Sequence, residues 1–204
     1  MSVSIYAFTI DLASYRAVQG SGDLALAERI SEQAADQIAA DDAWFVRLRP
    51  DHLPIENALR DIVIGDLRDG RSAGLSYQVA ALVLADYLGN RIDDEAIAEQ
   101  PSFVQASIDR AISELLAAYG GETCDWPLLS DVLARGPALN IPWVRESLPN
   151  GTGVVAKAEA RRAAETIARI PVQQDDDANE LALVYGSWLT RAAQANLALL
   201  LACE

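Results

Sequence analysis

The sequence contains few of the residues that build metal sites, disulfide frameworks and nucleophilic active sites. Its 204 residues include two cysteines, Cys124 and Cys203, and a single histidine, His52. Two cysteines make neither a disulfide framework nor a metal-type pair, and one histidine excludes a two-histidine zinc site. We therefore predict no metal site, no cofactor and no catalytic residue.

The chain is also poor in basic residues. Lys and Arg number 16 against 30 Asp and Glu, which gives a formal net charge of −14. Nucleic acids and anionic membranes both require a surplus of positive charge, so the composition argues against either as a partner. An acidic surface favours solubility and fast encounter with a basic protein, and the oligomeric state stays open.

Long apolar runs and a leader segment are missing as well. No apolar run is longer than residues 197–203, which are far too few to span a bilayer. The first residues lack the basic segment that begins a secretory signal. These features predict a cytoplasmic protein.

One segment has the pattern of a β-strand, and it begins at Val3. Both of its faces carry apolar groups, and β-branched and aromatic residues dominate it up to Ile10. Such a strand exposes apolar surface unless both faces are covered, so it needs a partner.

Most of the remaining chain shows helical periodicity. Residues 75–88 are apolar nearly all round, which is typical of a helix at the centre of a domain. A helix that starts after Asp23 is predicted to end at Asp41 and Asp42. The Pro- and Gly-rich residues 122–153 allow no helix longer than about two turns. The whole chain, residues 1–204, is predicted to form a single domain.

Short motifs are spread over nearly the whole chain. They are Tyr6-Ala7, Asp11-Leu12, Gly20-Ser21-Gly22-Asp23, Ala58-Leu59-Arg60 with Gly65, Gly74-Leu75-Ser76-Tyr77-Gln78, Leu88-Gly89, Arg135-Gly136-Pro137, Ile141-Pro142, Trp188-Leu189 and Ala192-Ala193. Together they resemble a bacterial family of small proteins known only as a domain of unknown function. No activity, cofactor or catalytic residue is attached to that family, so the resemblance implies no function.

The resemblance does bear on the fold, because relatives tend to end in a segment that reads as a strand. Local propensity favours a helix for the Ala- and Leu-rich residues 197–203. A strand there would give the N-terminal strand its partner. We therefore predict an α+β fold, mostly α, with six to eight helices around the helix at 75–88. A minimal sheet is predicted to pair residues 3–11 with residues 197–203.

Several polar groups could suggest chemistry, and each has a simpler interpretation. His52 is predicted to be a solvated loop side chain, and Cys124 to be a small buried or loop residue. Asp41-Asp42 and Asp175-Asp176-Asp177 are predicted to be solvated carboxylates at helix ends. Gly151-Thr152-Gly153 loosely resembles an anion-binding helix start, but it lacks the preceding strand and is predicted to be a turn.

The aromatic residues leave one candidate surface. Trp188 is predicted to lie in the core, whereas Trp44 and Trp143 lie beside irregular segments and could anchor an interface. The predicted partner interface consists of Asp41, Asp42, Trp44 and Trp143. The simpler alternative is packing of these rings onto the helices.

Two functions fit these observations. The first is a non-catalytic acidic binding protein, in concrete form an immunity or inhibitor protein that neutralises a basic partner. The second is an enzyme with a carboxylate-based site, acting with or without a metal ion, with no substrate indicated.

Overall fold

The computed structural model describes residues 2–3, 5–69, 71–92, 100–101, 104–119, 125–136, 138–142, 151–171 and 177–203. The chain forms two compact units. A sheet unit contains Met1–Ile10, Asn90–Gly136 and Ser147–Glu204, and a helical unit contains Asp11–Gly89 and Pro137–Glu146. The single domain over residues 1–204 stays a prediction, since two compact units can belong to one domain.

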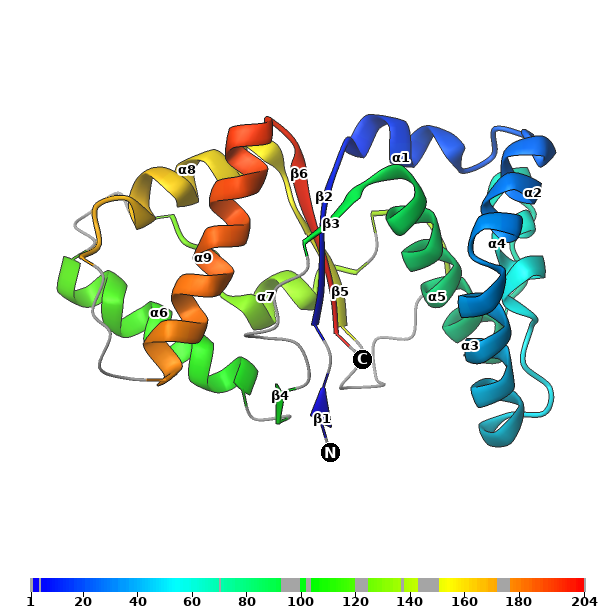
Figure 1. The fold of residues 1–204 in the computed structure, drawn as a ribbon, viewed down its shortest axis with the longest axis horizontal. Coiled ribbons are helices and arrows are strands. Elements are labelled where there is room, and N and C mark those ends of the chain that lie inside the picture. The colour runs from blue at the N-terminus through cyan, green and yellow to red at the C-terminus, as the bar shows by residue number, and fades with distance from the viewer. Residues whose placement is uncertain are drawn as a thin grey trace. The chain divides into compact units, whose positions relative to one another are not determined.

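The sheet unit is built on four antiparallel strands in the order β3-β2-β6-β5 (Figure 1). They are β2 (Ile5–Ile10), β3 (Asn90–Ile92), β5 (Gly151–Val155) and β6 (Ala198–Cys203). The first and last strands are neighbours, with Ile5 opposite Cys203 and Ile10 opposite Ala198. The predicted pairing of the two ends of the chain and the α+β class are therefore confirmed. The sheet is larger than predicted, and the short strands β1 (Ser2–Val3) and β4 (Gln100–Pro101) pair separately.

The Ala- and Leu-rich end of the chain is a strand because the preceding helix ends in a defined C-terminal cap. Helix α9 (Asp177–Ala195) is followed by Asn196, whose φ of 56° is left-handed. The Leu197 amide donates to the Ala192 carbonyl, which closes the helix in the manner of a Schellman turn. Both faces of the following strand are buried, so a continuous apolar run suits it.

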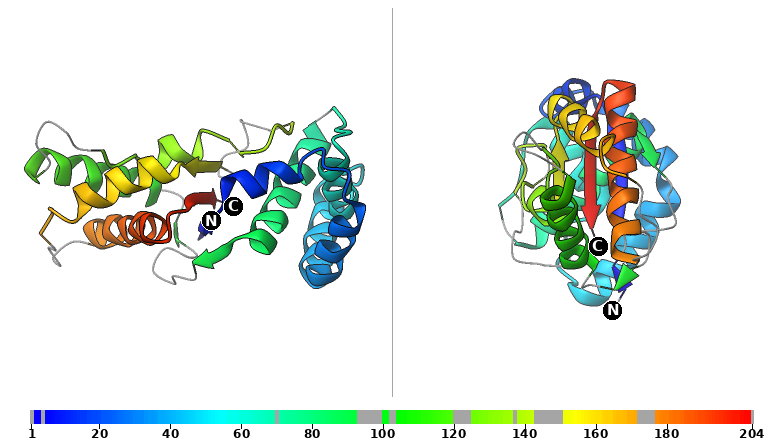
Figure 2. Two further views of the ribbon diagram at one scale, coloured as in Figure 1. Left: turned by 90° about the horizontal axis from the view of Figure 1, so that it is seen from above. Right: turned by 90° about the vertical axis from the view of Figure 1, so that its left-hand side faces the viewer.

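Four helices complete the described part of the sheet unit, and α9 lies against one face of the sheet (Figure 2). The others are α6 (Val104–Tyr119), α7 (Leu129–Leu133) and α8 (Lys157–Ile167). Their shared core includes Trp188, together with Ile5, Ala7, Leu199 and Leu201 from the sheet. Trp188 is 1% exposed, which confirms the prediction that it lies in the core. The Asp109 carboxylate accepts from the Leu129 amide at 2.6 Å and so caps α7.

The turn predicted at Gly151-Thr152-Gly153 is wrong, because these residues begin β5. A side chain at Gly153 would place its Cβ 1.6 Å from the carbonyl oxygen of Val132 in α7. The glycine is therefore required by the close approach of a helix to the strand, and not by an anion-binding loop.

The helical unit consists of five helices in its described residues. They are α1 (Leu12–Val18), α2 (Leu24–Gln33), α3 (Ala35–Leu48), α4 (Ile55–Ile64) and α5 (Arg71–Leu88). Asp23 caps α2 as its side chain accepts from the Leu26 amide at 3.0 Å. The apolar helix α5 packs against α1, α2 and α4, which places it at the centre of this unit.

The predicted helix end at Asp41 and Asp42 is wrong. The chain breaks earlier, at Ala34 (φ −99°, ψ 15°), and continues as α3 to Leu48. Ile38 and Phe45 are both buried and lie seven residues apart on one side of α3. Their burial holds the second helix in place although its remaining surface is largely exposed.

A buried polar link joins α4 to α5 and to the loop between them. The Tyr77 hydroxyl donates to the Asp61 carboxylate at 3.1 Å and accepts from the Arg68 amide at 2.7 Å. Burial raises the pKa of Tyr77. In the part of the chain that the structure describes, no helix has both the length and the apolar character needed to cross a membrane.

Candidate functional site

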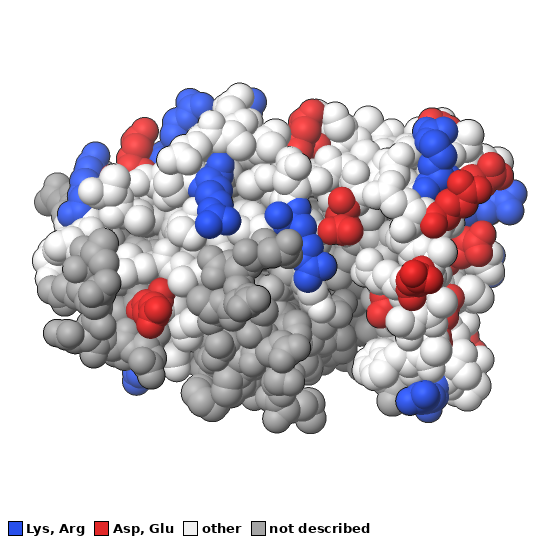
Figure 3. All heavy atoms as spheres, in the orientation of Figure 1, with Lys and Arg blue, Asp and Glu red and all other residues white. Residues whose placement is uncertain are grey.

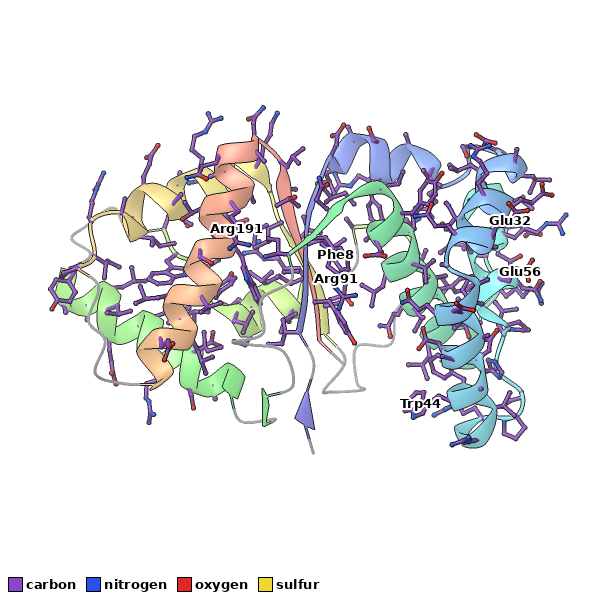
Figure 4. The ribbon with its side chains drawn as sticks, viewed as in Figure 1. Phe8, Glu32, Trp44, Glu56, Arg91 and Arg191 are labelled. Carbon is purple, nitrogen blue, oxygen red and sulfur yellow. The ribbon has the colours of Figure 1, made fainter. Side chains whose placement is uncertain are left out.

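Helix α3 presents an outward face that no other described element covers closely. Among its described side chains, only Ile38 and Phe45 are buried. Trp44 is 55% exposed and Val46 is 53% exposed, and both are large apolar side chains. Trp44 projects outward from the helix (Figure 4), and the surface at this end of the helical unit is mostly uncharged, with one basic side chain (Figure 3). Large exposed apolar groups gathered on one helix are typical of an interaction surface.

The Trp44 ring is held by an aromatic contact within the helical unit. It meets the buried Phe45 ring edge to face, with ring centres 5.2 Å apart. Phe45 in turn stacks on the His52 imidazole at 5.8 Å. Such aromatic contacts restrict the rings, so Trp44 is exposed but held in position.

Asp42 and His52 anchor α3 to the start of α4. One Asp42 carboxylate oxygen accepts from the Ile55 amide at 3.0 Å and lies 3.2 Å from His52 Nε2. The other ring nitrogen of His52 lies 3.2 Å from the Arg49 carbonyl oxygen. The His52 side chain is only 7% exposed. The prediction of a solvated loop histidine is therefore wrong, and Asp42 has a structural role in the middle of a helix.

Asp41 lies one residue earlier on α3 in a different environment. It is half-buried, and burial together with the neighbouring Asp42 carboxylate raises its pKa. The prediction of freely solvated carboxylates at a helix end is wrong for both aspartates, since both lie mid-helix and are partly buried.

An acidic pocket opens where α2, α3 and α5 meet within the helical unit. It holds about 240 Å³, and its charged lining residues are both acidic, Asp36 and Asp86. The remaining lining residues are Ile30, Gln33, Ala34, Gln37, Val83 and Tyr87. Carboxylates, amide oxygens and one aromatic ring around an apolar floor suit a long cationic side chain.

The pocket and Trp44 belong to one stripe of α3. Gln37, Asp41 and Trp44 follow each other at intervals of four and three residues, so they share one side of the helix. Gln37 lines the pocket, and Trp44 lies about 10 Å further along the helix axis. We call Asp36, Gln37, Asp41, Trp44 and Asp86 the acidic-aromatic stripe.

The structure brings together part of the predicted interface. Asp41 and Trp44 lie in the acidic-aromatic stripe, whereas the Asp42 carboxylate is used internally. Trp143 lies outside the described residues, as do Cys124, Asp175 and Asp176. Sequence reasoning missed Val46 and Asp86, and it interpreted Asp36, with Asp41 and Asp42, as a solvated carboxylate. The helical spacing of Asp36 and Trp44 could have indicated a shared surface if the end of the helix had been placed correctly.

A second groove, in the sheet unit, is less suited to ligand binding. It is lined by Thr9, Asn90, Arg91, Ile92, Arg191, Gln194 and Ala195. Arg91 pairs with Phe8 and its guanidinium lies over the Tyr6 ring at 4.8 Å, on the sheet face opposite α9 (Figure 4). The two arginines therefore do not converge on one anion.

The described part of the structure contains no cluster of metal-ligating side chains. In those ranges, no three or more His, Cys, Asp and Glu side chains are grouped so that they could hold a metal ion.

Comparison with known proteins gives a family and no activity. Neither a curated protein nor a solved structure matches the chain significantly. One family profile, described as a domain of unknown function (DUF7691), matches residues 1–204. That match confirms the resemblance indicated by the short motifs. The chain therefore belongs to the DUF7691 family over its whole length.

Proposed function

We propose that this protein is a non-catalytic binding protein that receives a basic segment of a partner protein on the acidic-aromatic stripe. The observation that carries the proposal is the acidic pocket between Asp36 and Asp86, two helical turns from the exposed Trp44. A Lys or Arg side chain of the partner enters the pocket, and a second cation packs on the Trp44 ring.

The charge of the chain supports this form of recognition. Between Asp23 and Asp42, six acidic residues accompany a single arginine, Arg29, and the whole chain carries a net charge of −14. Complementary charge speeds the encounter with a basic partner, and the tryptophan supplies the contact that slows dissociation. In its concrete form the partner is a basic toxin that the complex neutralises.

The experiment compares four baits in affinity capture from the cell of origin, followed by calorimetry with the purified partner. The baits are the wild type, Trp44→Ala, the pair Asp36→Asn with Asp86→Asn, and a control pair, Glu114→Gln with Glu165→Gln. The control removes the same charge from exposed positions on α6 and α8.

A basic protein held by the wild type and the control, but lost from both stripe variants, supports the proposal. Trp44→Ala is expected to weaken the purified complex by about 30-fold, since a central aromatic anchor contributes about 2 kcal/mol or more. Association must also slow as salt rises. Equal capture by all four baits would show that the stripe does not hold the partner. An equal loss from the two charge-reduced pairs, with full capture by Trp44→Ala, would show that binding follows net charge alone; either result would refute the site.

A further inference from the structure

The outward face of α3 carries a second pattern that partner binding does not explain. Asp36, Ala40, Ala43 and Arg47 follow each other at intervals of four, three and four residues, and all four are exposed. This is the spacing of the seam in a two-helix coiled coil. The seam has small residues at its centre and opposite charges at its two ends.

Two side chains flank the seam on each side. Gln37 and Trp44 lie along one edge, and Ala39 and Val46 lie along the other; all four are exposed. In an antiparallel pair of helices, the two equivalent edges face each other. When two α3 helices pack antiparallel, each edge of α3 therefore faces the same edge of the second copy.

We infer that α3 is a homodimer interface in which two copies of this chain pack their α3 helices antiparallel about a two-fold axis midway between Asp41 and Asp42. In this register Asp36 faces Arg47 of the second copy, and Ala40 faces Ala43 of the second copy. Along the edges Trp44 faces Gln37 of the second copy, and Val46 faces Ala39. Every contact occurs twice, as a two-fold interface requires.

The match is specific to a second copy in this orientation. A parallel pair would place Asp36 against Asp36 and Arg47 against Arg47, and like charges oppose association. The antiparallel pair gives two ion pairs at the ends, and the alanines between them let the helix axes approach closely. It also removes the exposed Trp44 and Val46 surfaces from water.

The dimer covers Asp36 and Trp44, which belong to the acidic-aromatic stripe. Self-association and binding of a basic partner would therefore exclude each other, and the dimer would be the resting form. The dimer itself does not depend on the proposed partner, because its contacts come from this chain alone.

The experiment is sedimentation equilibrium of the full-length protein with charge-reversal variants. The wild type is expected to show a concentration-dependent dimer. Asp36→Arg and Arg47→Asp each replace two attractions by two repulsions, and each should weaken self-association by about tenfold or more. Glu165→Arg on α8 is the matched control and should dimerise like the wild type. Circular dichroism establishes that every variant is folded.

Mixing the two weakened variants decides the register. In a mixed dimer the arginine introduced by Asp36→Arg meets the aspartate introduced by Arg47→Asp, and the unchanged Arg47 of the first variant meets the unchanged Asp36 of the second. The equimolar mixture should therefore dimerise about tenfold more tightly than either variant alone. The double variant Asp36→Arg with Arg47→Asp should recover the wild-type affinity. A monomeric wild type, or a mixture no tighter than its components, would overturn the inference and leave the proposed partner binding unaffected.

Discussion

Replacing Gly153 by alanine tests the closest helix-to-strand contact in the sheet unit. The added Cβ would lie 1.6 Å from the Val132 carbonyl oxygen and 2.5 Å from its carbonyl carbon. Real Cβ contacts essentially never fall below 3.0 Å, so α7 and β5 must separate by about 1.4 Å, the difference between that limit and the 1.6 Å to the oxygen. Both neighbours are backbone atoms, which cannot turn away as a side chain can.

The cost follows from the apolar side chains that α7 buries. Leu129, Val132 and Leu133 are each no more than 3% exposed, and full burial of such residues contributes about 1.5–3 kcal/mol apiece. A gap of 0.5–1 Å already removes about a quarter to a half of the dispersion attraction. We therefore expect Gly153→Ala to lower the free energy of unfolding by about 3 kcal/mol, or the melting temperature by about 6–12 °C.

The assay is urea unfolding followed by circular dichroism, with Gly22→Ala as the matched control. Gly22 has a φ of +73° and no neighbour within 4 Å of an added Cβ. Its replacement costs only the left-handed conformation, about 1 kcal/mol. If Gly153→Ala is as stable as Gly22→Ala or more so, the close approach of α7 to β5 is wrong.

Three further substitutions test the helical unit by the same unfolding assay. Asp42→Ala should cost about 1–2 kcal/mol because the Ile55 amide and His52 lose their acceptor, whereas Asp42→Asn keeps an oxygen acceptor and should cost less; equal costs would contradict the capping role. Tyr77→Phe should cost about 1–2 kcal/mol through the lost bonds to Asp61 and Arg68, and an unchanged unfolding midpoint would contradict it. The raised pKa of Asp41 means that the folded state holds this proton more tightly than the unfolded chain, so ionisation destabilises the fold as pH rises above about 3.9. Asp41→Asn should therefore stabilise the protein at pH 7 but not at pH 3, and by more than the exposed control Glu165→Gln; a gain that persists at pH 3 would contradict the assignment.

The pairing of the two ends of the chain could be predicted because the first strand is apolar on both faces. Such a strand needs cover and a neighbour, and the last apolar run is available. The strands β3 and β5 were missed for a physical reason. Asn90 and Arg91 in β3 are exposed on an edge strand, so they show no apolar alternation. In β5 two of the five residues are glycines, which propensity assigns to turns.

The candidate site was only partly predictable because one helix boundary was misplaced. The charged pair Asp41-Asp42 has the character of a helix end. The helix α3 nevertheless continues past it, because Ile38 before the pair and Phe45 after it are both buried. Asp86 reaches the acidic pocket from α5, a helix much further along the chain. Such a meeting depends on how α2, α3 and α5 pack, and no local pattern encodes it.

Binding of a basic segment to the acidic-aromatic stripe can be followed through the indole N–H resonances of the tryptophans during titration with a nona-arginine peptide. Trp44→Phe identifies the Trp44 signal, and the buried Trp126 and Trp188 are internal references. We expect the Trp44 signal to shift at low salt, Asp36→Asn with Asp86→Asn to weaken this response, and Glu114→Gln with Glu165→Gln to leave it unchanged. A Trp44 signal that stays in place while the peptide binds would contradict binding at the acidic-aromatic stripe.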